Sequence, residues 1–203
     1  MSMKINTATS MIAEPLFPQH SFVGDIELSE IQIDSIIKEI TTQTLYKYNW
    51  GMSGWNEDSD DVWHLTPRIQ SVAPLILKQC FDAITNQYNF TSMGNILHIG
   101  KVQYFLEVRR CFPLILYPGH DYPYFSHLGA FNGITILKCT NDGHKVYTRN
   151  LNYNVMEDNL KFWPPQPKQQ IFLPGKVSWG ISAGNDSSQT VALISHILLK
   201  RTN

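Results

Sequence analysis

Long runs of any one kind of residue are missing from this 203-residue chain, and each absence removes a class of function. Lys and Arg total 16 against 17 Asp and Glu, and basic residues gather in nothing larger than a pair such as Arg109–Arg110, so a nucleic-acid partner is not predicted. No stretch approaches the roughly 20 apolar residues of a membrane-spanning helix. The first residues also lack the apolar core of a signal peptide. We therefore expect a cytoplasmic protein that binds neither nucleic acid nor a membrane.

Cysteine is scarce as well. The three cysteines, Cys80, Cys111 and Cys139, are odd in number and form no Cys-x-x-Cys pair. Neither a disulfide framework nor a zinc ribbon is predicted, and we expect three buried thiols in a reducing compartment. The motifs GxSxG, HExxH, GxGxxG and the P-loop are absent too, which removes the usual sequence signatures of serine hydrolases, zinc proteases and nucleotide-binding enzymes.

Two helices are predicted in the first half of the chain. Ser29 and Gln32 form a capping box ahead of a helix over about residues 30–42, whose apolar face carries Ile33, Ile36, Ile37 and Ile40. A second helix is predicted from Pro74, which suits a first helical position, to about Asn89.

From Lys101 onward the apolar residues recur with a period of two, which is typical of β-strands. Six or seven short strands separated by Pro-Gly and Asn-Asp-Gly turns indicate a sandwich, a barrel or a jelly roll. We predict a mainly β protein with N-terminal α-helices. It should form one domain, 1–203, in which a helical and loop part, 1–100, packs on a β-barrel core, 101–200.

The segment 118–132 is the richest in side chains that can bind a metal, with His120, Asp121 and His127. Histidine and carboxylate groups are the usual ligands of catalytic iron or zinc. Adjacent residues of a strand face opposite ways, so a bend at Gly119 would be needed to bring His120 or Asp121 beside His127. The alternative is that these are ordinary polar side chains.

The pair Arg109–Arg110 lies in a predicted strand and should place one guanidinium inside the barrel and the other outside. The inner one is a candidate for binding an anion. A solvated or structurally paired arginine is the alternative.

The run from His127 to Asn132, HLGAFN, has the form HxGxxN and resembles a motif of the aspartyl/asparaginyl β-hydroxylase family. The upstream segment 116–119, LYPG, is similar to the L-x-P-G that precedes that histidine, and the resemblance covers about residues 110–200. It implies a double-stranded β-helix, cupin-like fold. It also implies an iron- and 2-oxoglutarate-dependent dioxygenase, an oxidoreductase in which His127 binds Fe(II) and a glycine replaces the ligating carboxylate of related oxygenases.

Two positions depart from that family pattern. The family's second iron-binding histidine falls at Trp179, and the arginine that pairs with 2-oxoglutarate falls at Gln189. Tryptophan has no lone pair for a metal, and glutamine has neither the charge nor the fork of a guanidinium. If iron is bound, His127 therefore needs a replacement partner. The candidates are His120, Asp121, His144 and His196, of which His120 and Asp121 are preferred.

Three functions remain open at this point. The first is an Fe(II)/2-oxoglutarate hydroxylase of a small molecule or of an amino-acid or peptide side chain, with His127 and Trp179 at its centre. The second is a metal-independent member of the same fold whose aromatic pocket binds, cyclises or isomerises a small molecule. The third is a non-catalytic β-sandwich interaction module. For the first two, the residues expected to bind substrate or cosubstrate at the barrel mouth are Tyr104, Tyr117, Tyr122, Tyr124, Asn132 and Gln189.

Overall fold

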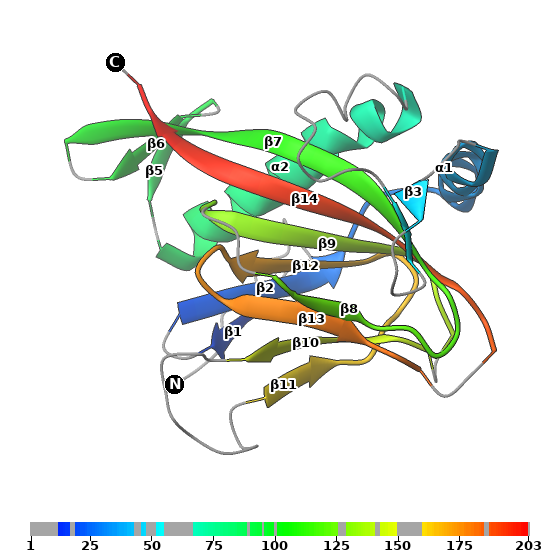
Figure 1. Cartoon of the computed structure of the whole chain (residues 1–203). Coiled ribbons are helices and arrows are strands. Elements are labelled where there is room, and N and C mark those ends of the chain that lie inside the picture. The colour runs from blue at the N-terminus through cyan, green and yellow to red at the C-terminus, as the bar shows by residue number, and fades with distance from the viewer. Residues whose placement is uncertain are drawn as a thin grey trace.

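Two sheets face each other, and helix α2 lies against the larger one with α1 beside it (Figure 1). The computed structural model describes residues 12–16, 19–42, 46–47, 52–54, 67–88, 90–94, 96–99, 101–125, 129–140, 143–149, 160–184 and 187–202. Neither helix among these residues is long and apolar enough to cross a membrane.

The helices form largely where the sequence predicts them. Helix α1 spans Glu30–Thr42, and the predicted capping box is confirmed, since the Ser29 N–H donates to Gln32 Oε1 at 2.9 Å and the Gln32 N–H to Ser29 Oγ at 3.3 Å. Helix α2 spans Pro67–Tyr88, so the start predicted at Pro74 is wrong. Pro74 lies inside the helix, where burial of apolar side chains on both sides of it outweighs the lost backbone hydrogen bond.

The larger sheet is antiparallel in the order β1-β2-β12-β9-β14-β7-β4-β3, with the hairpin β5-β6 attached to β7. Its strands are β1 Ile12–Leu16, β2 Gln19–Asp25, β3 Tyr46–Lys47, β4 Met52–Gly54, β5 Thr91–Met93, β6 Ile96–Ile99, β7 Val102–Leu116, β9 Phe131–Lys138, β12 Gln169–Pro174 and β14 Thr190–Arg201.

The smaller sheet is antiparallel in the order β11-β10-β13-β8. Its strands are β8 Tyr122–Phe125, β10 Lys145–Arg149, β11 Leu160–Trp163 and β13 Ser178–Ser182. From β7 to β14 the chain passes repeatedly between the two sheets, which lie one above the other in Figure 1. This is the double-stranded β-helix, and the predicted fold class is confirmed.

Two apolar clusters hold the layers together. The inner cluster fills the space between the sheets and consists of Phe112, Leu114, Leu116, Tyr122, Ile134, Ile136, Val146, Trp163, Ile171, Leu173, Val177, Trp179, Ile181, Ala192 and Ile194. The outer cluster joins the helices to the opposite face of the larger sheet, where its buried members include Leu106, Cys111, Ile115, Phe172, Val191, Leu193 and Ile197. Alternate residues of each long strand therefore enter different cores.

A bulge in β7 decides which residues face inward. His196 of β14 pairs with Arg110, but the next residue, Ile197, pairs with Val108, so Arg109 is the extra residue. The alternation of side chains reverses there. Residues 110, 112, 114 and 116 face the inner cluster, whereas Tyr104 and Leu106, before the bulge, pack against the outer cluster.

Candidate functional site

The barrel has two ends with different chemistry. We call the mouth the end where β8 stops at Phe125 and β9 starts at Phe131, and where β12 stops at Pro174 and β13 starts at Ser178. We call the base the opposite end, where β7 stops and β14 starts. The mouth and the base each include the last residues of both sheets whose side chains face the barrel interior at that end.

A row of three polar residues crosses the larger sheet at the mouth. Arg110 of β7 pairs with His196 of β14, and His196 pairs with Asn132 of β9. Residues paired in this way point to the same side of a sheet. That side is the barrel interior, because the His196 ring lies edge-on to Phe112 of the inner cluster, with ring centroids 5.6 Å apart.

The smaller sheet places Trp179 and Thr148 in its own last row at the mouth. These two residues are cross-strand partners on β13 and β10, and both are fully buried. The Trp179 indole stacks on Tyr122 with ring centroids 5.5 Å apart and an interplanar angle of 22°. Two stacked rings therefore fill the barrel interior below this row, on the side of the smaller sheet.

Two of these polar side chains are buried without a hydrogen-bond partner in the part of the chain that the structure describes. They are Asn132, in which neither Oδ1 nor Nδ2 has a partner, and Thr148, whose Oγ1 has none. A buried polar group left in this state costs about 1–3 kcal/mol. Native proteins keep few such groups, and each one suggests a bound ligand, ion or water.

The base contains polar side chains whose bonds are made. Buried His144 has Nδ1 3.0 Å from Thr190 Oγ1 and Nε2 3.1 Å from the carbonyl oxygens of Tyr117 and His120. With three partners around one imidazole, His144 joins the start of β14 to the β7–β8 connection. Its role is structural.

His120 and Asp121 also lie at the base, so the structure does not bring them to the mouth. Gly119 does form a turn, with a φ of 75°. The turn directs His120 Nδ1 to within 3.0 Å of the Pro118 carbonyl oxygen, and Asp121 Oδ1 accepts a hydrogen bond from the Ala183 N–H. The whole length of β8 separates both residues from Phe125, where that strand ends at the mouth.

The described residues do not fit an iron centre. Among them, no group of three or more His, Cys, Asp or Glu side chains is placed to hold a metal. His127, the first iron ligand implied by the resemblance, lies outside the described residues. At the place of the second ligand, the structure has the buried indole of Trp179, which offers no lone pair to a metal.

The other predicted site residues do not lie together. They are found in the inner cluster, against the outer cluster and on the surface. Tyr122 faces inward, while Tyr104 and Tyr117 pack against the outer cluster, Tyr104 because of the bulge at Arg109. Gln189 is exposed just before β14, and the next residue, Thr190, is the one that turns inward. The side chain of Tyr124 lies outside the described part of the structure.

Sequence reasoning missed one mouth residue and found the rest only in part. The sequence predicted that one member of the Arg109–Arg110 pair faces the barrel interior. In the structure this residue is Arg110, which is partly buried, whereas Arg109 is exposed. His196 was named from the sequence only as one of four possible replacement iron ligands, without diagnostic spacing. Thr148 had no signal, because a lone threonine in a strand is ordinary.

The cysteines add no nucleophile to the site. Cys80 and Cys111 are buried as predicted, whereas Cys139 is partly exposed. Burial raises the pKa of the Cys111 thiol to about 12, and it raises the pKa of Cys80 as well. Both thiols are therefore protonated at neutral pH, and a protonated thiol is a poor nucleophile.

No protein-family model matches this sequence, and no curated protein matches it either. Solved structures do match the fold. HygX from Streptomyces hygroscopicus, with nickel and 2-oxoglutarate bound, has a TM-score of 0.60 at 7% identity over 87% of this chain and 82% of that chain. SnoN, a non-heme alpha-ketoglutarate-dependent epimerase from nogalamycin biosynthesis, has a TM-score of 0.59 at 6% identity over 88% of this chain and 76% of that chain.

A third match is a prolyl-4-hydroxylase from Pseudomonas putida, with a TM-score of 0.54 at 11% identity over 90% of this chain and 93% of that chain. Identities this low establish a shared fold and no shared activity. The narrower resemblance to the aspartyl/asparaginyl β-hydroxylases stays a prediction. The chain has the double-stranded β-helix fold of the 2-oxoglutarate- and iron-dependent oxygenases.

Proposed function

We propose that this chain binds a small carboxylate-bearing molecule at the barrel mouth without needing a metal. The observation that carries the proposal is the Asn132 side chain, which is fully buried and has no partner for either amide atom among the described residues. Retaining such a group in a core is unfavourable unless something binds to it. Thr148 on the facing sheet supports the same interpretation.

The mouth residues define the chemistry of the ligand. The Asn132 amide offers donors on nitrogen and an acceptor on oxygen, so its best partner presents both a donor and an acceptor. Arg110 adds a guanidinium, whose planar fork suits a carboxylate. A small hydroxy acid or amino acid has both features, and this class includes the small-molecule or amino-acid substrate expected from the sequence.

His196 gives the mouth a group that can move a proton. It stands between Arg110 and Asn132 in the same row, so its imidazole would lie beside a ligand that bridges them. An imidazole can accept or donate a proton near neutral pH. In this proposal His196 serves as general acid or base in an isomerisation or cyclisation, which was the second of the three functions open from the sequence.

A second candidate is the Fe(II)/2-oxoglutarate hydroxylase. It is favoured by the fold and by the position of the described end of the HxGxxN run, since β9 starts at Phe131 at the mouth and Asn132 faces the barrel interior there. One observation opposes it. The buried Trp179 indole, which cannot bind a metal, fills the place of the second ligand.

Calorimetric titration separates the two candidates. L-malate, L-serine and 2-oxoglutarate would each be titrated into the full chain, once with a chelator and once with anaerobic Fe(II). The proposal expects at least one of these acids to bind in chelator, and Asn132→Leu to weaken that binding about 10- to 100-fold through the loss of hydrogen bonds to a charged ligand.

Thr135→Val is the matched control for this titration. Thr135 lies on the same strand as Asn132, but its hydroxyl faces the other side of the sheet and donates to Gln170 Oε1. We expect it to leave binding unchanged. Binding of 2-oxoglutarate only when iron is present, with succinate formed in air, would support the hydroxylase instead. No binding of any acid under either condition would overturn the proposal.

A further inference from the structure

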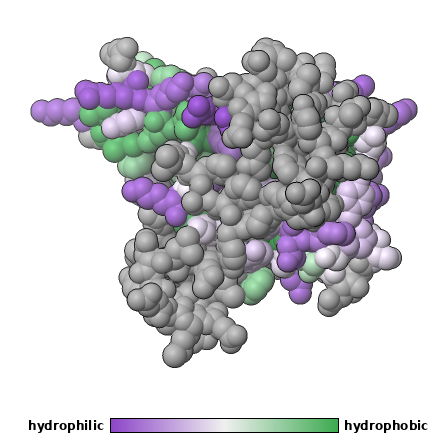
Figure 2. All heavy atoms as spheres, in the orientation of Figure 1, coloured by the Kyte–Doolittle hydropathy of each residue, from purple (hydrophilic) through white to green (hydrophobic). Residues whose placement is uncertain are grey.

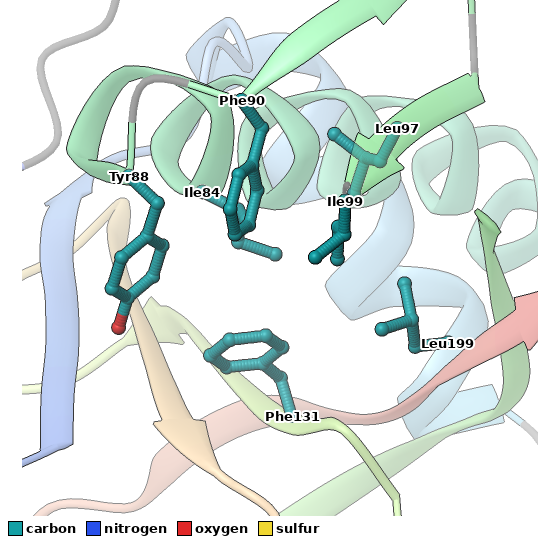
Figure 3. Close-up of a pocket in the computed structure, with 7 residues that line it drawn as sticks. All are labelled: Ile84, Tyr88, Phe90, Leu97, Ile99, Phe131 and Leu199. Atoms are coloured by element: carbon teal, nitrogen blue, oxygen red, sulfur yellow. The ribbon is translucent and has the colours of Figure 1, made fainter. Parts of the chain in front are cut away.

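We propose a second ligand site, outside the barrel, that binds a small uncharged apolar molecule such as a single ring or a short alkyl chain. It is a cavity of about 160 Å³ on the outer side of the larger sheet, and its lining residues surround a common space in Figure 3: Ile84, Tyr88, Phe90, Leu97, Ile99, Phe131 and Leu199. This inference is independent of the function proposed for the mouth.

The cavity is built from four parts of the chain. The end of α2 and the residues after it provide Ile84, Tyr88 and Phe90, and the hairpin strand β6 provides Leu97 and Ile99. Strands β9 and β14 close it with Phe131 and Leu199. In Figure 3, Phe131 faces Phe90 and Ile84 across the space.

Aromatic contacts hold the wall of the cavity in place. Tyr88 stacks on Phe90 with ring centroids 5.5 Å apart and an interplanar angle of 24°. His20 of β2 meets the Tyr88 ring edge-on at 5.8 Å, and its Nδ1 lies 3.3 Å from the Tyr88 hydroxyl oxygen. Tyr88 thus contacts both Phe90 and His20, and these rings cannot collapse into the space without losing those contacts.

The lining determines which molecules fit. Six of the seven lining residues have purely hydrocarbon side chains, and the seventh, Tyr88, has its hydroxyl beside His20. A water molecule needs two to four polar partners, so it is poorly held in such a space. Cavities of about 150 Å³ with Leu, Ile and Phe walls stay dry and accept a molecule the size of benzene. The ligand class is therefore apolar and about one ring in size.

The cavity can be reached from solvent. Tyr88 is 41% exposed and Leu199 is 37% exposed, while Leu97 is buried. Nearby on β5, Met93 is 72% exposed, and Figure 2 shows apolar side chains gathered on the part of the surface that contains β5, β6 and the end of β14. An apolar rim around a partly open hollow allows a small apolar molecule to enter.

This site is distinct from the mouth because the two use opposite faces of one strand. Phe131 and Asn132 are neighbours on β9, and Phe131 packs with the outer cluster while Asn132 faces the barrel interior. A substitution at either site can therefore be tested without touching the other. Failure of one proposal leaves the other standing.

The test uses benzene and 1-hexanol as probes, with binding followed by calorimetry and by methyl NMR shifts. Ile99→Phe should fill the cavity and weaken binding of both probes at least tenfold. Ile31→Phe, on the exposed face of α1 where Ile31 is 82% exposed, adds the same bulk elsewhere and should bind as wild type. In the wild type, the shifted methyl signals should centre on Leu97, Ile99 and Leu199, a result that does not depend on any variant folding.

Three outcomes would overturn this inference. The first is equal binding by Ile99→Phe and wild type. The second is methyl shifts that centre on the inner cluster instead of the cavity. The third is a wild-type dimer that Ile99→Phe dissociates, because the cavity would then be an interface between two copies of this chain and not a small-molecule site.

Discussion

Of two buried polar side chains at opposite ends of the barrel, one is hydrogen-bonded and the other lacks a partner in the part of the chain that the structure describes. At the base, the His144 ring has three oxygen partners within 3.1 Å, and these contacts join the start of β14 to the β7–β8 connection. At the mouth, the Asn132 amide is equally buried and has no partner among the described residues. The comparison teaches that a buried histidine whose hydrogen bonds are made is no guide to a site, whereas a buried amide without a partner is.

Removing the base histidine should have the largest effect on stability. His144→Ala leaves the Thr190 hydroxyl and two carbonyl oxygens without a partner and opens a cavity, so we expect a loss of about 2–4 kcal/mol in the free energy of unfolding. Urea denaturation measures this loss. A change below about 1 kcal/mol would mean that water replaces the imidazole, and the contrast between the two ends would weaken.

The corresponding change at the mouth should have the opposite sign. Asn132→Leu exchanges an unsatisfied amide for an apolar side chain of similar volume beside Ile134 and Leu173 of the inner cluster. The free energy of unfolding should stay the same or rise by about 1–2 kcal/mol. The same urea titration decides the question, and a loss above about 1 kcal/mol would show that Asn132 is part of the structural network.

Two buried threonines, one with a hydrogen-bond partner among the described residues and one without, allow the same comparison with a smaller expected change in stability. Thr135 and Thr148 are both fully buried on strands, but only the Thr135 hydroxyl has a partner, Gln170 Oε1. Thr135→Val should lower the free energy of unfolding by about 1 kcal/mol, while Thr148→Val should leave it unchanged or raise it by a similar amount. Equal losses in thermal melts of the two variants would contradict the difference drawn between them.

The smallest effect is expected at His120. Its side chain is exposed and makes one hydrogen bond to the Pro118 carbonyl, so His120→Ala should change stability by less than about 0.5 kcal/mol. Because His120 lies at the base, the variant should also leave the metal content of the purified protein unchanged. Elemental analysis that finds less iron in His120→Ala than in wild type would place a metal ligand at the base.

Much of the fold follows from local patterns in the sequence. The capping box at Ser29 and the period-two runs that became β9, β10, β12 and β14 depend on neighbouring residues only. Among the described residues after Lys101 the structure has eight strands, against the six or seven predicted. The strands β8 and β11 show little periodicity because each has four residues, and Pro123 lies within β8. The bulge at Arg109 was also missed, and it moved Tyr104 to the outer face.

The site was less predictable because it depends on pairing between distant residues. Asn132 was found through the HxGxxN run, yet its neighbours Arg110 and His196 come from strands far away in the sequence and meet it only through the register of β7, β14 and β9. Whether the Asn132 amide or the Thr148 hydroxyl has a partner is decided by three-dimensional packing. A single sequence contains no signal for that property.

The measurement that tests the central claim most directly is the calorimetric comparison of wild type and Asn132→Leu in chelator, with L-malate, L-serine and 2-oxoglutarate as ligands. The account predicts that wild type binds at least one of these acids and that Asn132→Leu binds it 10- to 100-fold more weakly while unfolding at the same or a higher urea concentration. Equal binding by the two proteins would contradict the assignment of the mouth as the ligand site.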